Sequence, residues 1–137
     1  VLTAARQYLE DKCSVMFFPE GTRSRDGKVH RFVDGAFRLA IKAGVPVLPI
    51  VVDGSRRALP KHSIWFEPNP ETIRVRVLPP VETDGYTVDE ARDLQRKVRD
   101  QIVAQLAEWR GVSPDEVDAL ADEEPEEESS AETEKQA

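Results

Sequence analysis

The apolar positions in the first half of the chain follow two kinds of pattern. Helical spacing predicts a helix over residues 2–11 and a second helix that begins at Asp34 and ends at Gly44. Unbroken apolar runs at residues 14–18 and 45–52 predict two buried strands. Strands that alternate with helices in this way are typical of an α/β fold.

In the second half, the pattern first favours strands and then one long helix. A short strand is predicted at residues 63–67, and the alternation of apolar residues with arginine in residues 72–78 predicts a half-exposed strand near a sheet edge. The capping-box sequence Thr87–Glu90 opens a helix that reaches residue 110. Its apolar stripe consists of Ala91, Leu94, Val98, Ile102, Leu106 and Trp109. The predicted fold class is therefore α/β, with a mixed sheet flanked by helices.

Three arginines, Arg92, Arg96 and Arg99, share the polar face of this helix. Such a face could contact anionic lipid headgroups. Because the helix as a whole is charge-balanced, the sequence favours a solvated face opposite a core-packing stripe.

Charge divides the chain into two parts. The net charge is −7, but residues 113–137 alone contain eleven Asp and Glu against one Lys, which leaves residues 1–112 at +3. A mildly basic part suits phosphate ligands or anionic lipid surfaces. We therefore expect one domain at residues 1–112 and an acidic, largely disordered tail at 113–137, with one more helical turn at Ser113–Glu116.

Composition also excludes several classes of function. The single cysteine, Cys13, forms no internal disulfide and is expected to be buried, which favours a reducing, cytosolic setting. The longest apolar stretch, residues 45–52, is far shorter than the ~20 residues that span a bilayer. No cluster of metal ligands is evident, so no bound metal is expected. The basic residues are few and no aromatic platform accompanies them, which argues against nucleic-acid binding.

The segment after the first predicted strand carries the candidate chemistry. Gly21 would let the backbone approach an anion closely, and Thr22 and Ser24 add short hydroxyl donors. Arg23 presents a planar fork that matches two phosphate oxygens. Glu20 would either orient Arg23 or accept a hydrogen bond from a ligand hydroxyl. From composition alone, an ordinary turn with a surface arginine is an equally good interpretation.

Two segments favour the phosphate-binding interpretation through resemblance. Residues Phe18–Ser24 resemble the FPEGTRS block of the glycerolipid acyltransferase family. Residues Val45–Ile50 resemble a later block of that family, an apolar strand broken by two prolines. The resemblance covers roughly residues 1–80.

A third segment, Phe32–Ala36, is similar to the family's aromatic-basic-x-Gly-Ala sequence with one departure. Val33 stands where the family often has lysine or arginine. One auxiliary phosphate contact is thereby in doubt, and Arg31 or Lys28 could replace it.

The resemblance implies an O-acyltransferase of phospholipid biosynthesis with a glycerol-phosphate acyltransferase-like fold. Such an enzyme moves an acyl group from acyl-CoA or acyl carrier protein to the free hydroxyl of 1-acyl-glycerol-3-phosphate, giving phosphatidic acid. The thioester is a co-substrate, and no cofactor is implied. The acceptor's phosphate and glycerol would be bound by Glu20, Gly21, Thr22, Arg23 and Ser24. The alternative is a non-catalytic α/β module that binds a phosphate or a lipid headgroup.

The family's His-x4-Asp block, in which histidine is the general base, does not occur in the chain. The spacing from His30 to Asp34 is one residue too short for this block. His62 to Glu67 has the right spacing, but the acid is a glutamate and the pair follows the loop instead of preceding it. Both histidines are therefore interpreted as surface or loop residues. We therefore expect the block upstream of Val1, with the N-terminal part of the domain missing and this chain inactive alone. A peripheral location at the cytoplasmic face of the cell membrane is expected, because the acceptor is a lipid.

Overall fold

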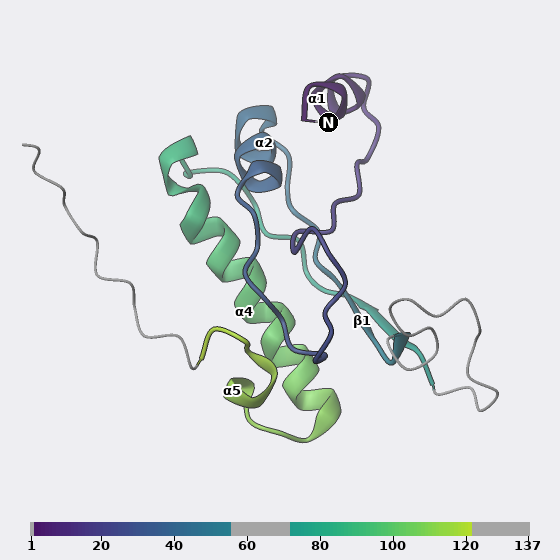
Figure 1. The fold of residues 1–137 in the computed structure, drawn as a ribbon. Coiled ribbons are helices and arrows are strands. Elements are labelled where there is room, and N and C mark those ends of the chain that lie inside the picture. Colours follow the sequence, from purple (N-terminus) through teal and green to yellow (C-terminus); the bar gives the residue numbers. More distant parts are fainter. Residues whose placement is uncertain (1, 56–71, 122–137) are drawn as a thin grey trace, which may run out of the picture.

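The protein is described by a computed structural model that covers residues 2–55 and 72–121, so the strand expected at 63–67 and the acidic stretch beyond residue 121 lie outside the described residues. The long helix α4 contacts α2, β1 and α5, while α1 packs against α2 (Figure 1). The elements are α1 (Leu2–Glu10), α2 (Gly35–Ala43), β1 (Ile50–Asp53), β2 (Arg74–Val77), the 3₁₀ turn η1 (Val88–Glu90), α4 (Ala91–Arg110) and α5 (Pro114–Val117).

The predicted helices are confirmed, and their ends follow local capping rules. Gly44 follows α2 with a φ of 62°, a left-handed conformation that glycine adopts without strain. At the start of the long helix, the Thr87 amide donates to Glu90 Oε2 at 2.7 Å, as the capping box requires. Asp34, where the sequence predicts that α2 begins, makes no side-chain capping hydrogen bond, and its Oδ2 lies 3.6 Å from Arg92 Nε instead.

The two buried strands predicted in the first half are only partly correct. Residues 14–18 form no strand, and Met16 and Phe18 are 70% and 79% exposed. In the second run only Ile50–Asp53 is a strand, and burial alternates along it, with Val51 inside and Val52 outside. A strand forms only where another segment supplies its hydrogen-bond partners, which an apolar run does not reveal.

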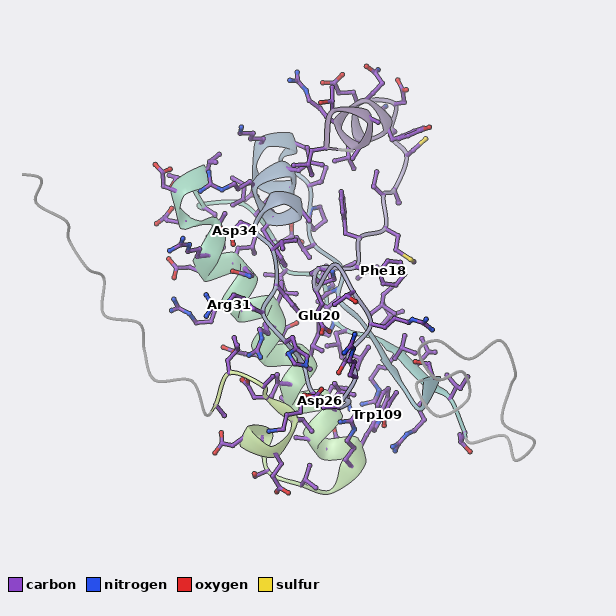
Figure 2. All side chains as sticks on the ribbon, viewed as in Figure 1. Phe18, Glu20, Asp26, Arg31, Asp34 and Trp109 are labelled. Carbon is purple, nitrogen blue, oxygen red and sulfur yellow. The ribbon has the colours of Figure 1, made fainter. Side chains whose placement is uncertain are left out.

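The sheet in the described part of the chain has two antiparallel strands, and its two faces differ. Ile50 pairs with Val77 and Val52 with Val75, so these four side chains share one face, where each is at least 41% exposed. The opposite face carries Val51 and two arginines of β2 that lie over Trp109 of α4 (Figure 2). Within residues 2–55 and 72–121, only one face of this sheet is therefore covered.

The core lies between α4 and the segments that pack on it. Leu94 and Ala91 of α4 have no exposed surface, and Val51 of β1 is 1% exposed. Phe32 and Phe37 stack beside them with ring centroids 6.3 Å apart. The predicted apolar stripe of α4 is confirmed, with Ile102 and Trp109 partly buried at its edge.

The folded region extends beyond residue 112, where the sequence placed the start of the tail. The expected turn is helix α5, with the capping box Ser113–Glu116 formed. Val117 is 1% exposed and belongs to the core. Residues 113–121 are therefore part of the folded region, although the sequence analysis placed the end of the domain at residue 112.

Three expectations from composition concern the cysteine, membrane-spanning segments and metal ligands. Cys13 is exposed, so the prediction that it is buried was wrong. Among the described residues, no helix has the length and apolarity to cross a membrane, and no group of three or more potential metal ligands occurs.

The turn after β1 yields a prediction about backbone strain. Gly54 has a φ of 87°, and a Cβ added there would lie 2.5 Å from the Thr72 carbonyl oxygen. Gly54→Ala should lower the free energy of unfolding by about 1–2 kcal/mol from left-handed strain alone, and by more from the contact. Gly44→Ala is the matched control, since its φ is 62° with nothing within 4 Å of the added Cβ. An equal loss of unfolding free energy in the two variants, measured by urea unfolding, would contradict the predicted clash between the added Cβ and the Thr72 carbonyl oxygen.

Candidate functional site

The segment expected to bind the acceptor begins with a tight turn. The Gly21 amide donates to the Phe18 carbonyl at 3.0 Å, with Pro19 and Glu20 at the turn's centre. Gly21 has a φ of 68°, and an added Cβ would meet nothing within 4 Å. Backbone conformation, rather than space, therefore requires glycine here, and the Gly21 N–H is engaged within the chain.

Glu20 and Ser24 both hold the shape of this loop. Glu20 Oε2 accepts a hydrogen bond from the His30 amide at 3.3 Å, and within the described residues no hydrogen bond or ion pair joins Glu20 to Arg23. Ser24 Oγ donates to Asp26 and accepts from the Gly27 amide at 2.9 Å. Of the two roles expected for Glu20, orienting Arg23 is therefore not observed.

Thr22 and Arg23 are exposed on the same loop. Within residues 2–55 and 72–121, no hydrogen bond or ion pair engages the Arg23 guanidinium. A guanidinium in this setting can bind an incoming anion without first breaking an internal ion pair. The structure thus brings the five predicted site residues onto one loop, while their role in binding stays a prediction.

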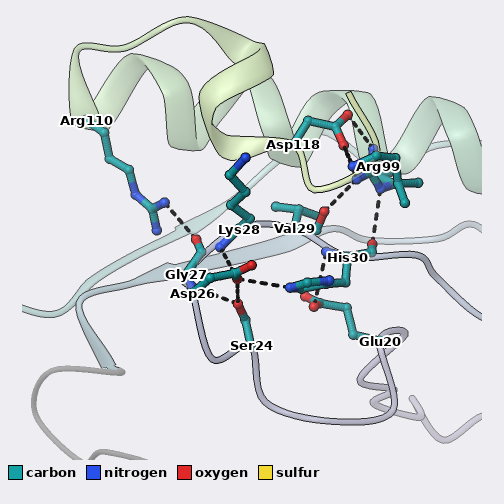
Figure 3. Close-up of polar contacts among 11 residues, drawn as sticks. Glu20, Ser24, Asp26, Gly27, Lys28, Val29, His30, Arg99, Arg110 and Asp118 are labelled. Atoms are coloured by element: carbon teal, nitrogen blue, oxygen red, sulfur yellow. Dashed lines mark hydrogen bonds and ion pairs between the residues drawn. The ribbon is translucent and has the colours of Figure 1, made fainter. Parts of the chain in front are cut away.

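Asp26 organises the middle of the loop, and the sequence analysis missed it. Its Oδ1 accepts from Ser24 Oγ at 2.8 Å and from the Lys28 amide and His30 Nε2 at 2.9 Å each (Figure 3). The Lys28 N–H, followed by the His30 and Ser24 contacts, outweighs partial burial and holds the Asp26 pKa well below its usual range. A Ser-x-Asp-Gly sequence is itself a turn signal that could have indicated this role.

Helix α4 holds the second half of the loop, residues 27–32, which we call the return arm. Three polar side chains of α4 donate to its backbone carbonyls: Gln95 to Phe32, Arg99 to Val29 and His30, and Arg110 to Gly27. Figure 3 shows the contacts of Arg99 and Arg110 as dashed lines. The loop is therefore fastened to the longest helix of the fold.

The sequence predicted that Arg99 lies on a solvated face of α4, and this prediction is wrong. It is 7% exposed and forms a two-pronged ion pair with Asp118, at 2.6 and 2.5 Å. The Arg99 guanidinium holds the pKa of Asp118 below its usual value. The paired residue comes 19 positions later, in a segment that reads as acidic tail, so helical periodicity could not reveal it.

The segment after α5 also pairs with the return arm. The Val29 amide donates to the Val117 carbonyl at 2.8 Å, and the Ala119 amide donates back to the Val29 carbonyl at 3.1 Å. These bonds form a parallel bridge between Val29 and Asp118. Residues 117–119 are therefore part of the support of the loop.

A second carboxylate, Asp53, joins the sheet to the end of α4. It accepts hydrogen bonds from Arg74 of β2 at 3.0 Å and from Arg110 of α4 at 2.7 Å. Burial raises the Asp53 pKa, but the hydrogen bonds and charges of Arg110 and Arg74 together lower it below its usual value. Arg110, which also binds the Gly27 carbonyl, thus connects the loop to the sheet.

Comparison with known proteins identifies the class. Residues 1–53 match the family model described as Acyltransferase. The chain is 38% identical over 103 residues to a 1-acyl-sn-glycerol-3-phosphate acyltransferase of Limnanthes douglasii, covering 75% of this chain and 36% of the relative. A protein of the same name from Haemophilus influenzae is 36% identical over 104 residues, covering 76% of this chain and 42% of the relative.

The fold has a solved counterpart. The crystal structure of the 1-acyl-sn-glycerophosphate (LPA) acyltransferase PlsC from Thermotoga maritima matches with a TM-score of 0.72 at 31% identity, over 82% of this chain and 45% of that one. Over residues 1–53 the chain thus belongs to the Acyltransferase family, and the predicted α/β fold class is confirmed. Within the family it is related to the 1-acyl-sn-glycerol-3-phosphate acyltransferases, of which it spans less than half the length.

Proposed function

We propose that the complete protein is an O-acyltransferase that acylates the free hydroxyl of 1-acyl-glycerol-3-phosphate and produces phosphatidic acid. The observation that carries this proposal is the exposed guanidinium of Arg23, which has no hydrogen bond or ion pair within the described residues and lies on a loop fastened to α4. The names of the relatives support the choice of acceptor.

In the proposed reaction, the acceptor hydroxyl oxygen attacks the thioester carbonyl carbon. A general base removes the hydroxyl proton, the new ester bond forms, and the thiol of CoA or acyl carrier protein leaves with a proton. No His-x4-Asp block occurs in the 137 residues, so the base is proposed to lie outside them. This chain would contribute the acceptor-binding side.

Arg23 would bind the acceptor phosphate through two parallel hydrogen bonds, with Thr22 and Ser24 near the same ligand. Glu20, held at one oxygen by the His30 amide, would accept a hydrogen bond from a glycerol hydroxyl. We further propose a peripheral location at the cytoplasmic face of the membrane, where the lipid acceptor resides.

The direct experiment supplies the complete protein with 1-acyl-glycerol-3-phosphate and either acyl-CoA or acylated carrier protein. Mass spectrometry should detect phosphatidic acid and the free thiol in equal amounts. Binding of the lysolipid with no product from either donor would favour the alternative function, a module that only recognises a phosphate headgroup.

A further inference from the structure

The support of the acceptor loop converges on one buried ion pair, Arg99 with Asp118. Arg99 Nε donates to the His30 carbonyl at 3.2 Å, and Nη2 donates to the Val29 carbonyl at 2.6 Å. Nη1 and Nη2 also donate to the two carboxylate oxygens of Asp118. Four acceptor atoms from two distant segments are thus held by one side chain.

This pair is connected to the predicted acceptor site by a single residue. His30 accepts from Arg99 through its carbonyl and donates through its amide to Glu20 Oε2. A shift of the His30 peptide groups would therefore move the carboxylate of Glu20. The ion pair lies outside the residues 1–53 that match the family model.

Because Arg99 is buried, its guanidinium depends on the hydrogen-bond partners described above. A buried guanidinium is stable only when its donors are paired, and Arg99 is 7% exposed. Removing Arg99 takes away its donor from the His30 carbonyl, whereas the Val29 carbonyl keeps the amide of Ala119. Loss of Arg99 should therefore loosen the His30 side of the return arm more than the Val29 side.

We propose that Arg99 and Asp118 are positioning residues that fix the acceptor-binding loop through the return arm. The kinetic part of this proposal rests on the proposed function, since it requires a lysophosphatidic acid acceptor. The structural part does not, because it concerns only how firmly residues 27–32 are held.

The kinetic test uses the complete protein carrying Arg99→Met, Arg99→Lys or Asp118→Asn. Arg99→Met should raise the acceptor KM between about 10- and 100-fold, since a displacement of about 1 Å at a binding group can cost that much. Arg99→Lys keeps the charge but lacks the fork, and Asp118→Asn keeps the shape but lacks the charge, so both should fall between Arg99→Met and wild type. The donor KM should change less than about twofold.

Arg96→Met is the matched control, because Arg96 lies on the same helix with a 71% exposed side chain, and its ion pair in the described part of the chain is a 3.5 Å contact to Asp93. Simple loss of folded protein would lower the apparent kcat and leave the acceptor KM unchanged. An acceptor KM in Arg99→Met equal to that of the control, or an equal rise in both KM values, would overturn the kinetic proposal.

Amide hydrogen exchange gives a second measurement that needs no activity. In Arg99→Met the His30 amide should exchange at least about tenfold faster than in wild type, while the amides of α2 stay unchanged. Unchanged exchange at His30 would refute the structural role of the pair. If wild type makes no phosphatidic acid but exchange accelerates as expected, the proposed function fails and the positioning role stands.

Discussion

Arg23→Ala is expected to raise the KM for the lysophosphatidic acid acceptor about 10- to 100-fold. A hydrogen bond between charged groups contributes about 1.5–3 kcal/mol, and each 1.4 kcal/mol is a factor of ten in affinity. Because Arg23 is exposed and makes no ion pair in the described residues, its removal leaves no buried partner uncompensated. The loss should therefore appear in acceptor binding rather than in stability, and steady-state kinetics of the complete protein measure it.

Two further variants make this result specific. Arg23→Lys should give a smaller rise in acceptor KM, because an ammonium keeps the charge but cannot match two phosphate oxygens in parallel. Arg38→Ala removes another exposed arginine, on α2, and should leave both KM values near wild type. An acceptor KM unchanged by Arg23→Ala would refute the assignment of the loop.

Leu94→Ala should lower the free energy of unfolding by about 2–5 kcal/mol, the range for removing a fully buried leucine. Leu94 has no exposed surface and lies at the centre of the core formed by α4, β1 and the return arm. Small domains are stable by only about 5–15 kcal/mol, so this one change should shift the urea midpoint strongly.

Val33→Ala is the control for this core prediction, because Val33 is apolar but 58% exposed. It should cost less than about 0.5 kcal/mol, as surface substitutions usually do. Similar midpoints for the two variants would mean that the packing around α4 is not as described.

The helices of this protein are predictable from sequence because their signals are local. The capping boxes at Thr87 and Ser113, and glycines just after α2 and α4, depend on neighbours within four positions. The strands were less predictable, since the pairing of Val51 with Arg76 joins segments far apart in the chain. Residues 14–18 have the composition of a buried strand, yet no described segment pairs with them.

The same distinction separates the predicted and missed parts of the site. The motif at residues 20–24 could be recognised as a contiguous block, because glycine, hydroxyl and guanidinium stand together. The support of the loop could not, since Arg99 reads as one more arginine on an exposed helical face. Its burial follows from contacts with residues distant in the sequence, namely Val29, His30 and Asp118.

The most direct test of the central claim, that this loop binds the phosphate of the acceptor, compares two acceptors in the complete protein. Lysophosphatidic acid and the corresponding monoacylglycerol share the acyl chain and glycerol and differ in the phosphate. Wild type should have a kcat/KM at least about 10-fold higher for lysophosphatidic acid, and Arg23→Ala should reduce that ratio by about 10- to 100-fold. A ratio that is the same in wild type and Arg23→Ala would contradict the account.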